Sequence, residues 1–393
     1  MKNNTSSYIM PTYGERKLEF QKGEGCYLTD IDNKKYLDFG SGIAVNSLGH
    51  CNPILVKALQ NQSTKLWHSS NLYFNQNQEE YAKLLCENSF ADKVFFTNSG
   101  TESIECGIKI IKTFHHYHKN FNKKIIITFD GAFHGRTFGS LSAQKKEKDN
   151  DIFKPLMPGF KKIPFNDIEK LKENINEDTA AIIIETIQGE GGIRPASLNF
   201  LDELKKMCSK FEVLLFFDEV QCGFGRSGKL FSYEWSNIKP DIMAVAKGIG
   251  SGFPMGACLA TSEASIGMIK GIHGSTFGGN PLAVSVGKAV LVEIISNNFL
   301  ENVDIVARYL WAELKKLESI FDELVEVRGA GLLLGLKTKT VNIKFNELLI
   351  KEGLLTIVAS DNIVRLSPPL IISKNNVNEA INIIRKVLED LDG

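Results

Sequence analysis

The sequence predicts an α/β fold: a large domain with a mostly parallel sheet flanked by helices, and a small α+β domain formed by both chain ends. Short apolar, β-branched runs alternate with helix-like segments through the middle of the chain, which is the pattern of a parallel sheet. These runs are apolar throughout, as in strands that are covered on both faces. The expected strands are residues 93–97, 124–129, 180–186, 213–219, 242–246 and 257–261.

The last third of the chain has a different pattern, typical of an α+β unit. Near the start, residues 25–42 indicate a small hairpin with Asp32 and Asn33 at its turn. The hairpin has no core of its own, so we expect it to pack on the C-terminal unit. The elements expected in that unit are helices 282–298, 302–321 and 375–391 and strands 324–337 and 362–372. The predicted division is a large domain of residues 46–284 and a small domain of residues 1–45 and 285–393.

Composition excludes several classes of protein. The chain has 393 residues, and its 46 Lys and Arg balance its 46 Asp and Glu, so nothing indicates a nucleic-acid or membrane partner. No apolar stretch approaches the roughly 18 residues of a membrane span. The seven cysteines are scattered, without C-x-x-C spacing, and the N-terminus lacks the apolar segment of a signal peptide. We therefore expect a cytoplasmic protein.

Two strand ends bring an acid and a lysine to one edge of the expected sheet. Asp218 and Glu219 end one strand, and Lys247 ends the next. Ligands of open α/β sheets lie beyond the carboxyl ends of strands. An acid can keep a pyridinium nitrogen protonated while a lysine forms a Schiff base. The alternatives are acids that cap the following segment and a lysine that extends to solvent.

Two further segments have the pattern of phosphate sites. Residues 98–101, "NSGT", separate a strand from a helix, and backbone N–H groups at a helix N-terminus bind phosphate. Glu102 also suits that helix dipole, so an ordinary capped helix start is the alternative. Residues 273–281, "HGSTFGGNP", again place hydroxyls and glycines before a helix.

Aromatic, basic and acidic side chains follow two other strands. In "FDGAFHGRT", Phe133 suits stacking on a cofactor ring, and the guanidinium of Arg136 suits a substrate carboxylate. In "ETIQGEGGIRP", Glu185 and Glu190 lie beyond another strand end.

The combination of these segments resembles the class III, pyridoxal-phosphate-dependent aminotransferases of fold type I. The segments "NSGTES", "FHGRT", "ETIQGEGG", "FFDEVQCGFGRSG", "AKGIGSGFPMGA", "STFGGNP" and "RLSPPL" occur in this order over nearly the whole chain. Within that class, "GIAVNSLGHCNP" and "GAFHGRT" most resemble the acetylornithine aminotransferases. The resemblance implies pyridoxal 5'-phosphate as the cofactor.

The resemblance also implies roles for individual residues. Lys247 would be the Schiff-base lysine and Asp218 the acid on the pyridinium nitrogen. Ser275 and Thr276 would reach into the site of a neighbouring subunit, Thr276 to the phosphate and Ser275 toward substrate, which implies a homodimer. The residues expected at the cofactor are Gly100, Thr101, Phe133, Asp218, Glu219, Val220, Gln221, Lys247 and Thr276.

Two arginines would divide the substrate carboxylates. Arg365 resembles the arginine that binds the α-carboxylate of glutamate or 2-oxoglutarate, and Arg136 the one that binds the carboxylate of N-acetylornithine. Glu190 resembles an acid that pairs with Arg365 while an ω-amine is bound. The implied reaction, in arginine biosynthesis, moves the δ-amino group of N-acetylornithine to 2-oxoglutarate, giving N-acetylglutamate semialdehyde and glutamate. The alternatives are 4-aminobutyrate, succinylornithine or succinyldiaminopimelate as amino donor.

Two competing functions and one departure from the family complete the sequence evidence. "KGIGSG" matches the dinucleotide-binding G-x-G-x-x-G, but a strand-like run follows it where that motif needs a helix. A binding protein without catalysis is disfavoured because Lys247, Asp218 and both arginines are present.

The "HHYH" of residues 115–118 indicates the polar end of a helix rather than a metal site. Thr186 replaces the proline usual in the family, which predicts a looser loop around Glu190.

Overall fold

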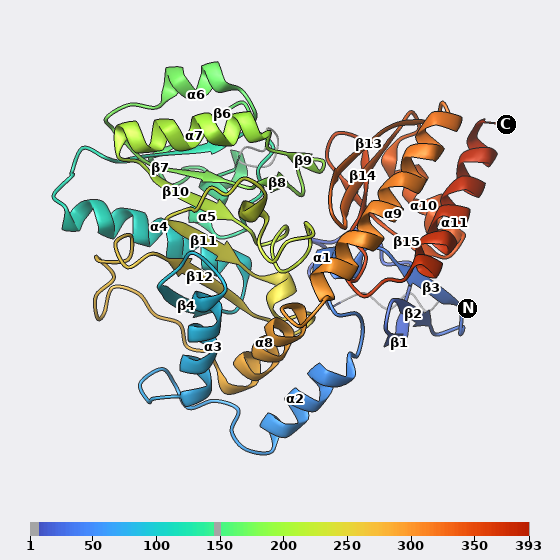
Figure 1. Ribbon diagram of the computed structural model, residues 1–393, viewed down its shortest axis with the longest axis horizontal. Coiled ribbons are helices and arrows are strands. Elements are labelled where there is room, and N and C mark those ends of the chain that lie inside the picture. The colour runs from blue at the N-terminus through green and yellow to red at the C-terminus, as the bar shows by residue number, and fades with distance from the viewer. Residues whose placement is uncertain (1–7, 145–150, 393) are drawn as a thin grey trace.

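A seven-stranded sheet lies at the centre of the larger part of the molecule (Figure 1). The computed structural model describes residues 8–144 and 151–392. Strand β12 runs antiparallel to both of its neighbours, and the remaining pairs are parallel. In spatial order the strands are β4 (Lys93–Thr97), β12 (Gly256–Ala260), β11 (Ile242–Val245), β10 (Leu214–Asp218), β7 (Thr179–Ile184), β5 (Ile125–Phe129) and β6 (Phe160–Ile163).

Six of these strands coincide with the predicted ones to within two residues. Strand β6, at the edge of the sheet, was not among the predicted strands. Its sequence, "FKKI", has lysines at both central positions, so it lacks the continuous apolar pattern of the buried strands. Edge strands commonly carry lysine because it discourages pairing with another chain.

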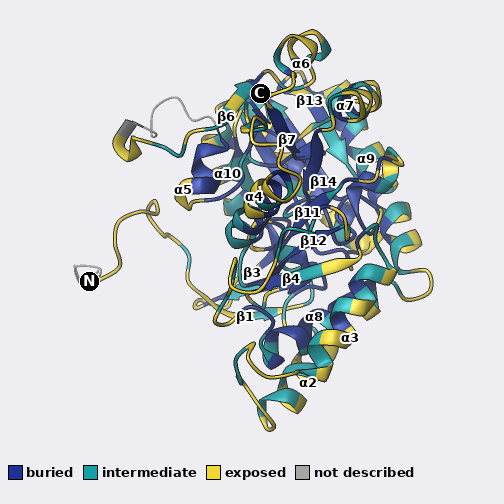
Figure 2. Cartoon of the chain, turned by 90° about the vertical axis from the view of Figure 1, so that its left-hand side faces the viewer, coloured by how far each residue is buried: buried dark blue, intermediate teal, exposed yellow. Residues whose placement is uncertain are grey.

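Helices cover both faces of the sheet. Helix α4 (Gly100–Tyr117) packs Ile104 and Ile108 on one face, in a cluster that includes Phe216 of β10. Helix α7 (Leu198–Phe211) packs on the other face, and the strands between the helical layers are buried (Figure 2). Coverage on two sides explains why the strands are apolar throughout. The other helices of this part are α1 (Ser41–Ala44), α2 (Pro53–Ser63), α3 (Gln76–Glu87), α5 (Phe138–Ser142), α6 (Ile168–Asn174), α8 (Pro281–Ile294) and the 3₁₀ turns η1 (Asp151–Phe153), η2 (Ser232–Trp235) and η3 (Lys247–Ile249).

The C-terminal part is a smaller unit with a four-stranded antiparallel sheet backed by helices. Strand β14 lies between β13 and β17, and β16 forms the far edge. Short strands β8 (Ile187–Gln188) and β9 (Arg194–Pro195) pair beside this unit. The elements are β13 (Leu324–Ala330), β14 (Leu333–Thr338), β16 (Ile357–Ala359), β17 (Ile363–Leu366), α9 (Phe299–Ile320), α10 (Asn342–Lys351) and α11 (Lys374–Asp392).

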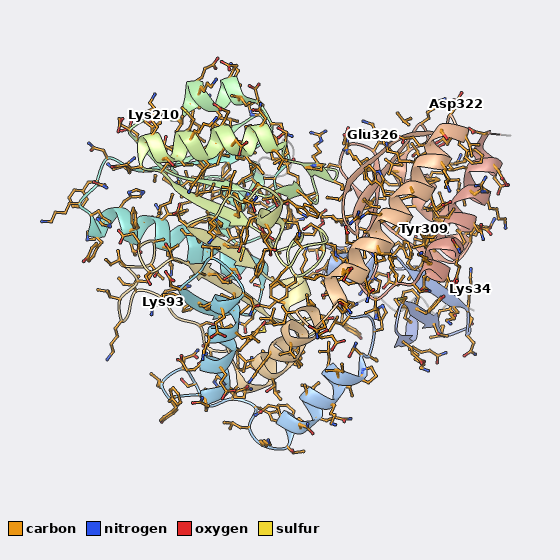
Figure 3. The ribbon with its side chains drawn as sticks, viewed as in Figure 1. Lys34, Lys93, Lys210, Tyr309, Asp322 and Glu326 are labelled. Atoms are coloured by element: carbon orange, nitrogen blue, oxygen red, sulfur yellow. The ribbon has the colours of Figure 1, made fainter. Side chains whose placement is uncertain are left out.

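The N-terminal strands complete this unit from the other end of the chain. Strands β1 (Phe20–Glu24), β2 (Tyr27–Asp30) and β3 (Lys35–Asp38) form a meander whose turn contains Asn33 in a left-handed conformation. Strand β3 pairs in parallel with β15 (Leu354–Leu355). Lys34, at the turn, donates to the carbonyl of Lys351 at 2.8 Å and lies at the same end of the molecule as Tyr309 of α9 (Figure 3). The predicted fold class is therefore confirmed.

Helices α8 and α9 link the two parts. The predicted division between residues 284 and 285 falls inside α8. The domain boundaries stay a prediction, and residues 1–7 and 393 lie outside the described part of the chain. No single helix in that part is both long and apolar enough to cross a membrane; α8 and α9, bent by 70°, meet the length and composition test only as a pair.

Candidate active site

A cavity of about 440 Å³ opens at the carboxyl ends of the parallel strands. Lys247 follows β11, Asp218 ends β10, and Glu185 follows β7. This is the edge at which the sequence predicts a site. The predicted site residues that line the cavity are Gly100, Thr101, Phe133, Arg136, Asp218, Val220, Gln221 and Lys247.

Lys247 begins the 3₁₀ turn η3 with a left-handed backbone, φ 49°. Such a conformation is unfavourable for a residue with a side chain, and backbone strain of this kind is common at functional sites. Burial lowers the pKa of Lys247 to about 8, and the charge of Arg365 acts in the same direction. The uncharged fraction of the amine near neutral pH is therefore much larger than that of an ordinary lysine.

Asp218 is buried and bonded to a histidine. Its Oδ2 lies 2.7 Å from Nδ1 of His134, and its Oδ1 accepts a hydrogen bond from the backbone of Val220 at 3.0 Å. Burial alone would lower the pKa of His134, but the hydrogen bond and charge of Asp218 raise it above its ordinary value. The sequence did not identify His134, because its spacing from Asp218 carries no recognisable motif.

The start of α4 presents backbone to the cavity. Ser99 caps the helix by accepting from the N–H of Glu102 at 3.4 Å, so the capped-start interpretation also holds. A Cβ on Gly100 would lie 2.8 Å from Cγ1 of Val220, which leaves room only for glycine there. The Thr101 hydroxyl accepts a hydrogen bond from the backbone N–H of Arg136 at 3.2 Å and hence joins the two predicted loops.

The loop after β5 carries Phe133 and Arg136. The guanidinium of Arg136 lies 5.1 Å from the ring centre of Phe133, within the range of a cation–π contact. Arg136 is exposed and Phe133 is half-buried, so the arginine lies at the open side of the cavity.

Arg365 and Glu190 form an ion pair close to this cavity. Nη1 of Arg365 lies 2.7 Å from Oε1 of Glu190 and donates to Oε1 of Gln221 at 2.9 Å. Arg365 is fully buried, and its Nε and Nη2 have no hydrogen-bond partner among the described residues. Burial alone would raise the pKa of Glu190, but Arg365 and Lys247 lower it below its ordinary value. The unpartnered donors suit a bound carboxylate.

Glu185 joins two of the loops around the cavity. Its carboxylate accepts from the backbone N–H of Phe133 at 3.0 Å and of Gly189 at 3.1 Å. Burial raises the pKa of Glu185 to about 7, and Asp218 adds to the shift. The sequence located Glu185 at a strand end without a role, and the structure adds these contacts.

Five of the predicted residues do not line this cavity: Glu190 and Arg365, described above, and Glu219, Ser275 and Thr276. The carboxylate of Glu219 turns away and accepts from the backbone of Ser232 at 2.7 Å and of Tyr233 at 2.8 Å. Ser275 and Thr276 line a separate cavity of about 660 Å³. Ser275 is nevertheless linked to the Lys247 cavity through Asn98. Asn98 lines that cavity, and its side chain donates to the Ser275 hydroxyl at 3.3 Å.

Thr186 and the histidines of α4 have local partners. The Thr186 hydroxyl contacts the hydroxyl of Ser232 and the thiol of Cys222, and a proline cannot make these contacts. Nε2 of His115 lies 2.8 Å from the carbonyl of Ala180, so this histidine faces the sheet. Within residues 8–144 and 151–392, no three His, Cys, Asp or Glu side chains gather as a metal site requires.

Comparison with known proteins identifies the fold and the chemistry together. The profile of the family described as aminotransferase class-III matches residues 8–388. The chain belongs to this family. The resemblance of the sequence to class III aminotransferases is thereby confirmed, and the protein is an aminotransferase.

Relatives within the class III aminotransferases match over almost their full length. The acetylornithine aminotransferase of Mesorhizobium japonicum is 48% identical over 97% of this chain and 96% of its own. That of Clostridium acetobutylicum is 45% identical over 98% of this chain and 100% of its own.

Solved structures of aminotransferases have the same fold. The ornithine aminotransferase of Toxoplasma gondii has a TM-score of 0.94 and 27% identity, covering 98% of this chain and 93% of its own. The N-acetylornithine aminotransferase of Stenotrophomonas maltophilia has a TM-score of 0.85 and 32% identity, covering 97% and 98%.

The class III aminotransferase family implies pyridoxal phosphate, and the cavity suits such a group. Lys247 offers an amine of lowered pKa, and Asp218 a buried carboxylate for a ring nitrogen. The side-chain-free backbone of Gly100 opens the N-terminus of the 18-residue helix α4 to a phosphate. Half-buried Phe133 offers a flat face on the cavity wall.

Proposed function

We propose that the protein transfers the δ-amino group of N-acetylornithine to 2-oxoglutarate, with pyridoxal 5'-phosphate as cofactor, in a homodimer. The relatives that match over their full length are acetylornithine aminotransferases, at 45% to 48% identity for the two described above. The Lys247 cavity has the residue types that both half-reactions require.

The choice of substrate rests on one observation, which is that the two arginines near Lys247 differ in exposure and in ion pairing. Arg136 is exposed at the cavity mouth, whereas Arg365 is buried and paired with Glu190. An ω-amine has no carboxylate beside its reacting carbon, so Glu190 can stay on Arg365 while Arg136 binds the distant carboxylate. Glutamate brings a carboxylate to that position, and Glu190 must then release Arg365. A buried guanidinium left unpaired would be costly in either case.

The proposed division of work follows from the chemistry of each side chain. The bound cofactor would take up the electron pair that is released when a proton leaves the substrate carbon. Lys247 would hold the cofactor covalently and, once displaced, accept and return that proton, a role that suits an amine with a pKa of about 8. Asp218, held by His134, would bind the ring nitrogen. Gly100 and Thr101 would hold the phosphate at the start of α4, with Val220 and Phe133 on the two sides of the ring.

The homodimer is supported by the surface around Thr276. Large apolar side chains are exposed there: Leu72, at 88%, lines the same cavity as Thr276, and Phe277, the next residue in the chain, is exposed at 58%. Exposed apolar patches of this kind mark protein–protein interfaces. Ser275 and Thr276, which do not line the Lys247 cavity of their own chain, would then complete that of the partner subunit.

A panel of amino donors tests the proposal. We expect kcat/KM to be highest for N-acetylornithine among N-acetylornithine, ornithine, succinylornithine, succinyldiaminopimelate and 4-aminobutyrate, each with 2-oxoglutarate. Arg136→Ala should lower kcat/KM for N-acetylornithine far more than it lowers the use of 2-oxoglutarate, because Arg136 is proposed to bind the distant carboxylate of the amino donor. A clear advantage for 4-aminobutyrate or free ornithine would overturn the proposed substrate while leaving the family assignment intact.

A further inference from the structure

The loop that carries Glu190 is fastened to a hairpin of the C-terminal unit and to strand β13. This loop joins β8 to β9, and the hairpin is formed by β16 and β17. The backbone N–H of Ser360, in the hairpin turn, donates to the carbonyl of Glu190 at 3.0 Å. Arg328 of β13 reaches the same loop and donates from Nε to the carbonyl of Gly192 at 2.8 Å.

An ion cluster centred on Asp361 adds side-chain links at the same place. Asp361 Oδ2 lies 3.0 Å from Nη2 of Arg194, at the end of the loop, and 2.7 Å from Nη2 of Arg328. Its Oδ1 lies 3.0 Å from Nζ of Lys337. Partial burial would raise the pKa of Asp361, but its three basic partners hold that pKa well below the ordinary range.

The backbone of the hairpin turn aims Asp361 at this cluster. Asp361 and Asn362 both have left-handed conformations, φ 62° and 57°, as the favoured tight hairpin turns require, and Asp and Asn tolerate them best. Asn362 is fixed in turn, because its amide donates to the carbonyls of Thr338 and Thr340 at 2.7 and 3.0 Å.

Glu190 is therefore held at two points by one hairpin. Its carbonyl accepts from Ser360, and its carboxylate pairs with Arg365 of β17. With its backbone fastened, Glu190 can leave Arg365 only by rotating its side chain, and on rotating back it meets the same guanidinium. An unfastened loop would carry the carboxylate away and leave Arg365 open to any incoming carboxylate.

We propose that the ion pair between Asp361 and Arg194 is a positioning device that keeps Glu190 on Arg365, and so sets how readily the enzyme accepts α-carboxylates at that arginine. This rests on the proposed division of carboxylates between Arg136 and Arg365. Asp361 and Arg194 touch neither substrate nor cofactor in this assignment. They act through the backbone of the loop on the side chain of Glu190.

The test compares variants of the loop link with a matched variant of the same cluster. Asp361→Asn and Arg194→Gln each remove the ion pair between loop and hairpin, and both leave the backbone hydrogen bond from Ser360 to Glu190 in place. Glu326→Gln is the control, because Glu326 pairs with Nη1 of Arg328 at 3.0 Å, whereas Arg328 contacts the loop through Nε and Asp361 through Nη2. Arg194 has 44% of its side chain exposed, so its replacement should leave folding intact if Asp361→Asn does not.

In the holoenzyme, we expect both link variants to lower KM for glutamate by about threefold to fivefold, the upper range for a partly exposed ion pair. Their kcat, and KM for the ω-amine, should stay within about twofold of wild type by the same reasoning. Amide hydrogen exchange in residues 187–195 should become faster in both, and Glu326→Gln should change neither quantity.

Unchanged amide hydrogen exchange in residues 187–195 would show that the ion pair between Asp361 and Arg194 does not hold the loop, and would overturn the proposal. Faster exchange with an unchanged or raised KM for glutamate would overturn its effect on Arg365, as would an equal loss of kcat with every substrate, which a merely structural role predicts. The exchange measurement needs no substrate, so its failure is distinct from failure of the proposed function, which the amino-donor panel reports.

Discussion

Burial shifts the pKa of individual side chains in the Lys247 cavity. For acids and bases alike, the shift favours the uncharged form. The pKa of Lys247 falls to about 8 and that of Glu185 rises to about 7. His134 shows the opposite effect, because the hydrogen bond and charge of Asp218, 2.7 Å away, raise its pKa against the effect of burial. The cavity therefore contains an amine that loses its proton more readily than an ordinary lysine, beside a carboxylate bonded to a histidine.

The lowered pKa of Lys247 makes a prediction about cofactor capture. Only the uncharged amine attacks an aldehyde, so apoprotein should capture pyridoxal phosphate slowly below pH 8 and faster above it, with a midpoint near 8 in place of the ordinary 10.5. The measurement is the rate at which visible absorbance develops, followed by borohydride trapping and peptide mapping. Lys247→Ala should trap no cofactor. A midpoint near 10 would show that burial does not lower this pKa.

The two arginines predict opposite defects. Arg365→Ala should lower kcat/KM for 2-oxoglutarate about 100-fold, because truncating one partner of a buried charge pair costs about 2–5 kcal/mol. Its effect on the half-reaction with N-acetylornithine should be below about tenfold, since Arg365 binds no substrate carboxylate there. Arg136→Ala should show the reverse pattern. Single-turnover measurements of each half-reaction check this, and equal damage to both would contradict the divided labour.

For individual residues, the sequence predicted the position of a side chain in the fold more accurately than its hydrogen-bond partners. It placed Lys247 and Asp218 correctly at neighbouring strand ends, because parallel strands share an edge. It missed His134 and the partners of Glu219, since these contacts depend on the turns that follow the strands. The link between Arg194 and Asp361 joins distant segments and has no local signature.

Helix α4 shows how one element serves both packing and the site. Its isoleucines cover the sheet, while its first residue lies on the cavity wall. Gly100→Ala would bring a Cβ to 2.8 Å from Cγ1 of Val220, so either the valine or the helix start must move. We expect the dissociation constant of pyridoxal phosphate to rise about tenfold, or about 1.4 kcal/mol, as for a modest overpacking. Titration of apoprotein measures it.

Gly14→Ala is the matched control for this change, because nothing lies within 4 Å of a Cβ there. Unchanged cofactor affinity in Gly100→Ala would mean that the start of α4 does not approach the phosphate.

Most strands of the large sheet could be predicted from the sequence, because strands that are covered on both faces are apolar throughout. Strand β6 could not, since an edge strand needs few apolar residues. Nor does composition predict the pairing of β3 with β15, because it depends on where the C-terminal unit leaves an open edge.

At the scale of the whole molecule, the proposed dimer has a functional consequence. If Thr276 completes the partner's site, co-expressed Lys247→Ala and Thr276→Ala subunits should regain activity, because each mixed dimer contains one site with neither change. We expect the mixture to reach up to about a quarter of wild-type activity, well above the mean of the two separate variants. Activity equal to that mean would contradict sites shared between subunits.

The joining of β3 to β15 has a consequence for how the protein is made. Lys34 and Lys351, which bond across this junction, are 317 residues apart in the chain. At a synthesis rate of about 5–20 residues per second, the N-terminal strands leave the ribosome roughly 16–60 s before their partner exists. During that interval β3 has an open edge, on which a chaperone or another nascent chain can add a strand. The first residues made are thus among the last to reach their final place.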